Sequence, residues 1–223
     1  MLRITDARTG ALTEVRRTLT RVQAHVTGAD TSALRVLLVA DVLARALELD
    51  RVPALTIADP PPDLRERTQA LGIRPAETTA PVTGRTLHVA GPDTPVPEDG
   101  VHVQVAPVAG TADDSVLRLT LLSVPRAAPV DPGAAADEAR TTLTRWRKAV
   151  AAWATRPSRP VPEAVRQDLR TAWENDLDVP SVLDVLRRVE QAEDLSDGAR
   201  FETYAYADRL LGLDLTRDIG AAP

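Results

Sequence analysis

The sequence predicts an α/β protein in two parts: a small parallel sheet with helices over residues 1–112, followed by an all-α helical bundle over 113–223. Two observations support this fold class. The first part alternates strand-like and helix-like segments, which is typical of a parallel sheet. The second part, from Asp113 onward, has apolar residues at helical spacing throughout.

The first part holds one strand–helix–strand unit. Residues 21–27 (RVQAHVT) alternate polar and apolar side chains, as a half-buried strand does. Residues 32–49 give the strongest helical pattern of this part, and residues 52–57 (VPALTI) predict a buried strand. This order predicts a parallel crossover. The proline-rich segment that follows ends the strand, and residues 62–71 predict a short helix.

The middle of the chain, residues 74–110, is rich in proline, glycine and threonine. Two short strands are predicted there, at 86–89 (TLHV) and 101–105 (VHVQV). The stretch GPDTPVPEDG between them predicts a loop.

The second part is predicted to be helical, and Pro132, Pro162 and Pro180 stand near helix starts, where the missing N–H has no cost. The predicted helices cover residues 115–123, 132–155, 162–174, 180–192 and 197–211. In the longest helix the apolar residues repeat at intervals of four and three, which predicts a core seam. They are Ala139, Leu143, Trp146, Val150 and Trp153.

Composition narrows the function classes. The chain has no cysteine, which excludes disulfides, thiolate nucleophiles and thiolate-bound zinc and fits a cytoplasmic location. The formal net charge of −5 is too small to indicate a polyanion binder by itself. No apolar run approaches the roughly 20 residues of a membrane span, and the N-terminus lacks the apolar core of a secretory signal, so no membrane partner is predicted.

Three segments of the second part resemble, in order, the region that follows the catalytic domain of cysteinyl-tRNA synthetases. They are VLRLTLLSVPRAAPVDPG (116–133), ENDLDVPSVLDVL (174–186) and LLGLDL (210–215). The first part has weaker matches to the same family at 2–15, 24–31, 34–47 and 101–106. The resemblance implies a reduced Rossmann-like sheet of the class I synthetase (HUP) type.

The motifs that give this family its chemistry are missing. The His-Ile-Gly-His-like turn and the Lys-Met-Ser-Lys-Ser loop, which hold ATP in the family, have no counterpart, and Lys148 lies in a different element. Two zinc-binding cysteines of the family fall on Thr27 and Val105, and the anticodon-reading domain is not matched. The resemblance therefore implies a truncated, degenerate paralogue without catalytic residues, cofactor or metal, with ATP left as a weak possibility.

Three hypotheses about function follow. The first is a non-catalytic binding protein, a pseudoenzyme whose partner is a protein or an RNA such as tRNA. The second is a protein that reuses the synthetase cleft, either as a divergent ATP-dependent ligase of the aminoacyl-adenylate type or to bind another small molecule. The third is a structural subunit of a homo-oligomer.

The second hypothesis places a ligand at the turn GADTS, where Gly28, Thr31 and Ser32 precede or begin the long helix. A helix N-terminus after a strand is a common phosphate site. The alternative is an ordinary capping turn, which Asp30 favours because it repels phosphate. His25 and His102, from two predicted strands, would line the same cleft.

The histidines also raise a metal alternative. His25, His88 and His102 could meet at strand ends with Asp30 or Asp93, since a metal site needs at least three converging ligands. Strand histidines that satisfy local hydrogen bonds are the simpler interpretation, and no metal is predicted.

The RNA hypothesis depends on a segment, 139–162, that has no acidic residue. Basic residues interleaved with aromatic ones bind RNA through phosphate contacts and stacking. The alternative is that Trp146 and Trp153 belong to the core and the basic residues form a solvated face. The candidates are Arg140, Arg145, Arg147, Lys148, Arg156 and Arg159.

Overall fold

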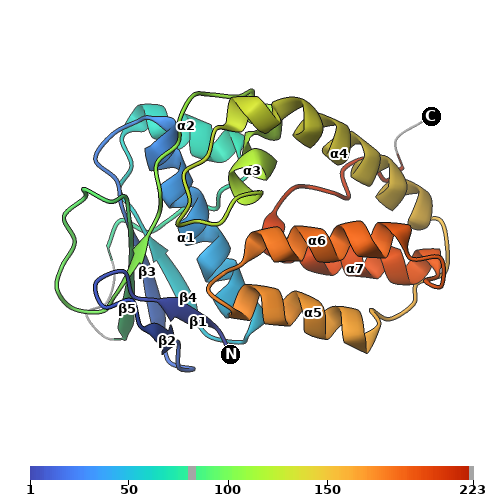
Figure 1. Cartoon of the computed structure of the whole chain (residues 1–223), viewed down its shortest axis with the longest axis horizontal. Coiled ribbons are helices and arrows are strands. Elements are labelled where there is room, and N and C mark those ends of the chain that lie inside the picture. Colours follow the sequence, from blue (N-terminus) through green and yellow to red (C-terminus); the bar gives the residue numbers. More distant parts are fainter. Residues whose placement is uncertain (80–83, 221–223) are drawn as a thin grey trace.

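The computed structural model describes residues 1–79 and 84–220 and shows a mixed α/β fold with a four-stranded parallel sheet (Figure 1). The strand order is β4-β3-β5-β6, and every neighbouring pair is parallel. These strands are β3 (Thr20–His25), β4 (Ala54–Ile57), β5 (Arg85–Ala90) and β6 (Val101–Gln104). The predicted Rossmann-like α/β fold is confirmed at this level.

Each predicted helix is present, and no end differs from the prediction by more than two residues. The helices are α1 (Thr31–Leu49), α2 (Pro62–Ala70), α3 (Asp114–Leu122), α4 (Pro132–Trp153), α5 (Glu163–Glu174), α6 (Val179–Gln191) and α7 (Asp197–Leu211). The antiparallel hairpin of β1 (Arg3–Thr5) and β2 (Leu12–Glu14) was not predicted. Strands of three residues are too short to show a clear alternation.

Helix α1 lies between the sheet and the helices of the second part (Figure 1). It packs on β3, β4 and β5 on one side and contacts α7 on another. Fifteen of its nineteen residues are buried, so its buried surface extends around most of the helix. A helix that is apolar nearly all round is expected to be enclosed by other elements.

The predicted seam of α4 is buried along its whole length. Trp146 and Trp153 both pack edge-on against Tyr204 of α7, with ring centroids 5.6 and 5.1 Å apart. The interpretation of these tryptophans as core residues is therefore confirmed. With aromatics at only 3% of the sequence, these three rings concentrate a large apolar area at one point.

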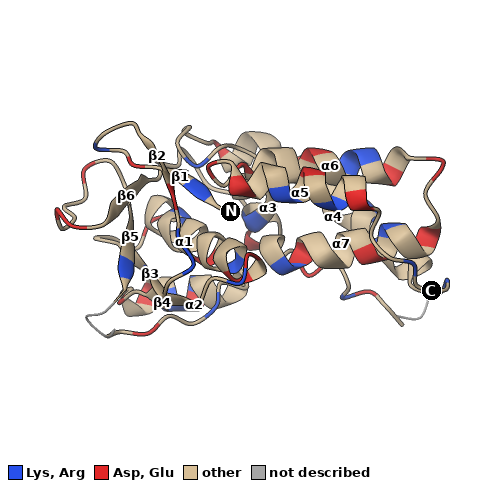
Figure 2. Ribbon diagram, turned by 90° about the horizontal axis from the view of Figure 1, so that it is seen from below, with Lys and Arg blue, Asp and Glu red and all other residues tan. Residues whose placement is uncertain are grey.

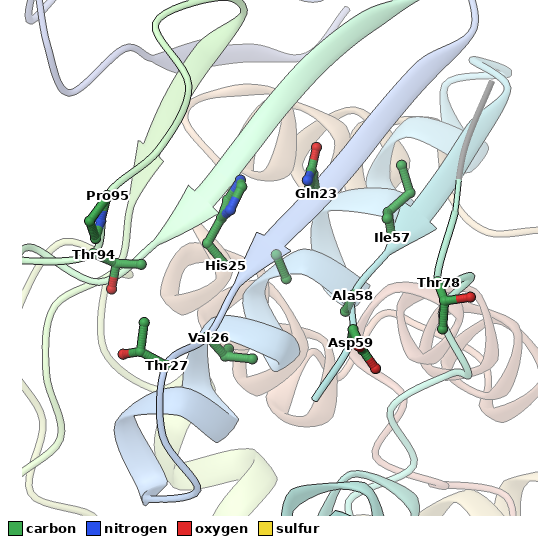
Figure 3. A pocket seen from close by; sticks show the side chains of 11 residues that line it. Gln23, His25, Val26, Thr27, Ile57, Ala58, Asp59, Thr78, Thr94 and Pro95 are labelled. Carbon is green, nitrogen blue, oxygen red and sulfur yellow. The ribbon is translucent and has the colours of Figure 1, made fainter. Parts of the chain in front are cut away.

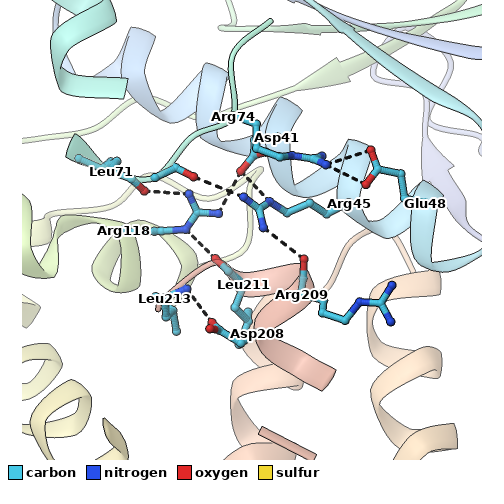
Figure 4. A network of polar contacts seen from close by, with 11 residues as sticks. Asp41, Arg45, Glu48, Leu71, Arg74, Arg118, Asp208, Arg209, Leu211 and Leu213 are labelled. Carbon is cyan, nitrogen blue, oxygen red and sulfur yellow. Dashed lines mark hydrogen bonds and ion pairs between the residues drawn. The ribbon is translucent and has the colours of Figure 1, made fainter. Parts of the chain in front are cut away.

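A buried ion-pair network joins the two parts (Figure 4). Arg118 of α3 donates to Asp41 of α1 (3.1 Å) and to the carbonyls of Leu71 (2.9 Å) and Leu211 (2.6 Å). Burial alone would raise the pKa of Asp41, but the charges of Arg118 and Arg45 outweigh burial and lower it. The predicted boundary at 112/113 falls just before α3, and one continuous apolar core extends across it.

The two faces of the sheet differ in chemistry. Val22, Leu87 and Val103 are buried on the face that α1 covers. By strand alternation, His88 and His102 belong to the opposite face, where they stand side by side in register. Loop residues lie against this face, because the Ala7 amide donates to the His102 carbonyl and Gly100 lies beside the His88 ring.

Candidate ligand site at the carboxyl edge of the sheet

The sheet has a topological switch point between β3 and β5. Strand β3 leads through α1 to β4 on one side, while β5 lies on its other side. The segments that leave β3 and β5 diverge there, and open α/β sheets bind ligands at this place. Two adjoining cavities lie at this edge, of about 290 and 230 Å³.

The two cavities share His25, Val26, Thr27 and Thr94. In the larger cavity, the side chains of Thr27 and Thr94 lie on one side of His25, and those of Ala58, Asp59 and Thr78 lie on the other (Figure 3). The smaller cavity reaches the start of α1 and is also lined by Gly28, Asp30, Ser32 and Asp93. We call the two cavities together the switch-point cleft.

The structure brings three of the five predicted ligand-site residues into this cleft: His25, Gly28 and Ser32. Thr31 is 8% exposed, and its hydroxyl accepts a hydrogen bond from Arg67 at 3.3 Å, outside the lining. His102 lies on β6, beyond β5, and lines neither cavity.

The start of α1 is already occupied by its own cap. Asp30 accepts a hydrogen bond from the Ala33 amide at 2.8 Å, and Ser32 Oγ accepts one from the Val108 amide at 3.0 Å. The turn GADTS is therefore a capping turn, as the alternative interpretation held. An anion at this helix end would meet the Asp30 carboxylate, which opposes the attraction of the helix dipole.

The charge of the cleft also opposes phosphate. Asp30, Asp59 and Asp93 are among the residues that line it, whereas no lysine or arginine is among the described lining residues. Asp59 is paired with Arg65 at 2.9 Å, so Asp30 and Asp93 carry most of this negative charge. The remaining polar groups are hydroxyls, the Gln23 amide and the His25 ring. Such a lining suits a neutral or positively charged polar ligand.

The histidines form a row across the face of the sheet opposite α1. His25 Nε2 lies 2.9 Å from Nδ1 of His88, and the two ring centroids are 5.1 Å apart. Burial lowers the pKa of all three histidines, including His102, so they are neutral at pH 7. Within residues 1–79 and 84–220, no group of three His, Cys, Asp or Glu side chains is placed to hold a metal ion.

Most of the basic residues proposed for RNA are exposed but engaged within the protein. Arg145 pairs with Glu190 at 2.8 Å, and Arg147 donates to the carbonyls of Leu213 and Asp214. In Figure 2, blue and red bands alternate along α5, α6 and α7. Of the other four candidates, Arg140 pairs with Asp137 and Arg156 pairs with Asp197, whereas Lys148 and Arg159 are exposed.

Comparison of the sequence with models of known protein families and with curated proteins found no match. The resemblance to cysteinyl-tRNA synthetases therefore stays a prediction. No helix among the described residues is long and apolar enough to cross a membrane.

Sequence reasoning considered a meeting of the histidines only as a metal alternative, and it missed Thr94. The His25–His88 contact depends on β3 and β5 being neighbours, although 63 residues separate the two histidines in the chain. The contribution of Thr94 comes from a loop that has no pattern of its own. Both features depend on the order of the strands in the sheet, which local periodicity does not encode.

Proposed function

We propose that the protein is a synthetase-like binding protein without adenylation activity, whose switch-point cleft takes a small polar molecule that carries an amino group. The observation that carries the proposal is the charge of the cleft. Its lining holds carboxylates, hydroxyls and a neutral histidine, with no lysine or arginine among the described lining residues. A primary ammonium group is the ligand group that such a lining stabilises best.

The size of the cleft supports a small ligand. Each cavity by itself, of about 290 or 230 Å³, is smaller than the ~300–1,000 Å³ typical of sites for drug-sized molecules. A free amino acid or a short amine fits this volume, whereas an aminoacyl-adenylate would need both cavities at once. The chain also lacks both ATP-holding motifs of the synthetases, which favours a small amine over an aminoacyl-adenylate.

A protein or RNA partner, the first hypothesis from the sequence, has less support. The arginines of α4 are largely paired with acidic residues or with backbone carbonyls, so their charge is partly neutralised. An exposed surface pair is weak, however, and a polyanion can displace it. RNA binding is therefore kept as an outcome of the test below.

The proposal is tested by thermal shift followed by calorimetry, with the free amino acids, short amines, ATP and bulk tRNA as probes. A ligand at 100 times its Kd stabilises the fold by about 2.7 kcal/mol, which a melting curve resolves. We expect a shift with one or more amines and none with ATP. A shift with ATP or tRNA alone would refute the proposal.

A matched pair of variants locates the binding. Gly28 lines the smaller cavity, and a Cβ there would meet nothing within 4 Å, so Gly28→Phe introduces a ring at the cleft from an unobstructed Cβ. Ala134→Phe adds the same ring at an exposed position of α4. Amine binding should be lost in the first variant and kept in the second. Equal binding by both variants would place the ligand elsewhere.

A further inference from the structure

Three side chains form a continuous series that ends in the cleft. Asp99, in the loop before β6, places a carboxylate oxygen 3.6 Å from Nε2 of His88. Nδ1 of His88 lies 2.9 Å from Nε2 of His25. The series therefore runs from an exposed carboxylate, through a histidine that is 2% exposed, to a ring that lines both cavities.

The chemistry of each group fixes the direction of the protons. The Asp99 oxygen lies just beyond hydrogen-bond distance of Nε2 of His88, but its negative charge favours the tautomer in which this Nε2 carries the proton. A neutral imidazole has one N–H, so Nδ1 of His88 is an acceptor. It can then bond His25 only if Nε2 of His25 donates. Nδ1 of His25 is left with its lone pair.

The opposite arrangement is unfavourable. If Nδ1 of His88 carried the proton, its Nε2 lone pair would face the Asp99 carboxylate at 3.6 Å. The lone pair and the carboxylate would then repel each other beside a nearly fully buried ring, where solvent screens the repulsion least. Among the described residues, no hydrogen bond engages Nδ1 of His25.

We infer that Asp99 and His88 are positioning residues that set the tautomer of His25, so that Nδ1 of His25 accepts a hydrogen bond from the ammonium group of the ligand. The inference rests on the proposed function and names the atom that recognises the amine. Asp30 and Asp93, from the walls of the cleft, supply the negative charge around that group, while Asp59 is paired with Arg65 at 2.9 Å.

Both rings stay neutral at physiological pH, which this role requires. Burial is the largest cause that lowers the pKa of His88, and the charges of Arg8 and His102 act in the same direction, while Asp99 opposes them. Burial also lowers the pKa of His25, assisted by His88 and His102. A protonated His25 would repel an ammonium group, so neutrality and amine recognition belong together.

The tautomers can be measured directly, without a ligand. The chain has three histidines, so a nitrogen-15 NMR spectrum of the full-length protein shows three ring patterns. We expect His88 and His25 both to carry the proton on Nε2 at pH 7. A proton on Nδ1 of either ring would overturn the inference, whether or not an amine binds.

A charge-matched pair of variants tests the consequence for binding. Asp99 is 69% exposed, so Asp99→Lys is tolerated and replaces the acceptor with a donor. The whole series should reverse, and Nδ1 of His25 should then carry a proton. Glu98→Lys makes the same change of charge one residue away, at another exposed position. Both variants are first compared with the wild type by thermal unfolding.

We expect Asp99→Lys to weaken amine binding about tenfold or more relative to Glu98→Lys, since a hydrogen bond to a charged group is lost. Equal affinity of the two variants would overturn the inference while leaving the cleft as the binding site. Failure of every amine to bind the wild type would instead refute the proposed function, a result that the tautomer spectrum cannot mimic.

Discussion

Replacement of Arg118 by methionine tests whether the network of Figure 4 holds the two parts together. The change removes the donor to Asp41 and to two backbone carbonyls, at a side chain that is 7% exposed. Removal of one partner of a buried ion pair costs about 3–5 kcal/mol. Asp41 keeps Arg45 at 2.9 Å and Arg74 at 2.8 Å, so its charge is still compensated. We therefore expect a loss near 3 kcal/mol.

The assay is urea unfolding followed by circular dichroism, with the free energy of unfolding extrapolated to water. Arg74→Met is the matched control, because Arg74 contacts the same carboxylate from a position that is 38% exposed. Solvent screening limits its contribution to about 1 kcal/mol. Equal losses in the two variants, or a loss below about 1 kcal/mol for Arg118→Met, would refute the assignment of Arg118 as the buried link.

Three further predictions concern pH, packing and charge. The pKa of each histidine is below 6.5 in the fold, so the free energy of unfolding should be constant above pH 6.5 and fall below it. The fall should reach up to about 1.4 kcal/mol per pH unit for each histidine. A flat profile between pH 7 and 5 in urea melts would contradict this. Gly198→Ala would drive a Cβ into the Pro157 carbonyl and should cost about 1–3 kcal/mol, whereas Gly28→Ala, in open space, should leave the melting temperature nearly unchanged. Asp30→Ser keeps a capping side chain and removes a negative charge from the cleft. Calorimetry should therefore show that the variant binds inorganic phosphate more tightly than the wild type does, at nearly equal stability. Unchanged binding would mean that Asp30 does not repel anions there.

The helices and the parallel strands were predictable because their signals are local. The spacing of Ala139, Leu143 and Trp146 defines a buried face without knowledge of any neighbour, and prolines mark where α4, α5 and α6 begin. The β1–β2 hairpin was missed because each strand has three residues, and what fixes it is distant: the Thr5 amide donates to Asp176, 171 positions away.

Part of the candidate site was predictable from the sequence because its signal is local. Gly28 and Ser32 belong to one strand-to-helix turn, so sequence alone places them at a sheet edge. The prediction that His102 lines the cleft was wrong, because β6 lies beyond β5 and the register of these strands places His102 beside His88, outside both cavities. The 2.9 Å contact between His25 and His88 depends equally on strand order, which sequence spacing does not encode.

The position of α1 restricts how a ligand can reach the cleft. Many two-part proteins admit a ligand by rotation about a hinge between their parts. Here α1, which begins at the cleft, packs both on the sheet and against α7, and its Asp41 accepts a hydrogen bond from Arg118 of α3. Rotation of either part would therefore disrupt the shared core. The loops at 26–30 and 91–100 border the cleft and are largely exposed, so a ligand enters between them without rotation of either part. We expect hydrogen exchange to be fast in those loops and slow along α1, with the helix and the sheet opening only in global unfolding.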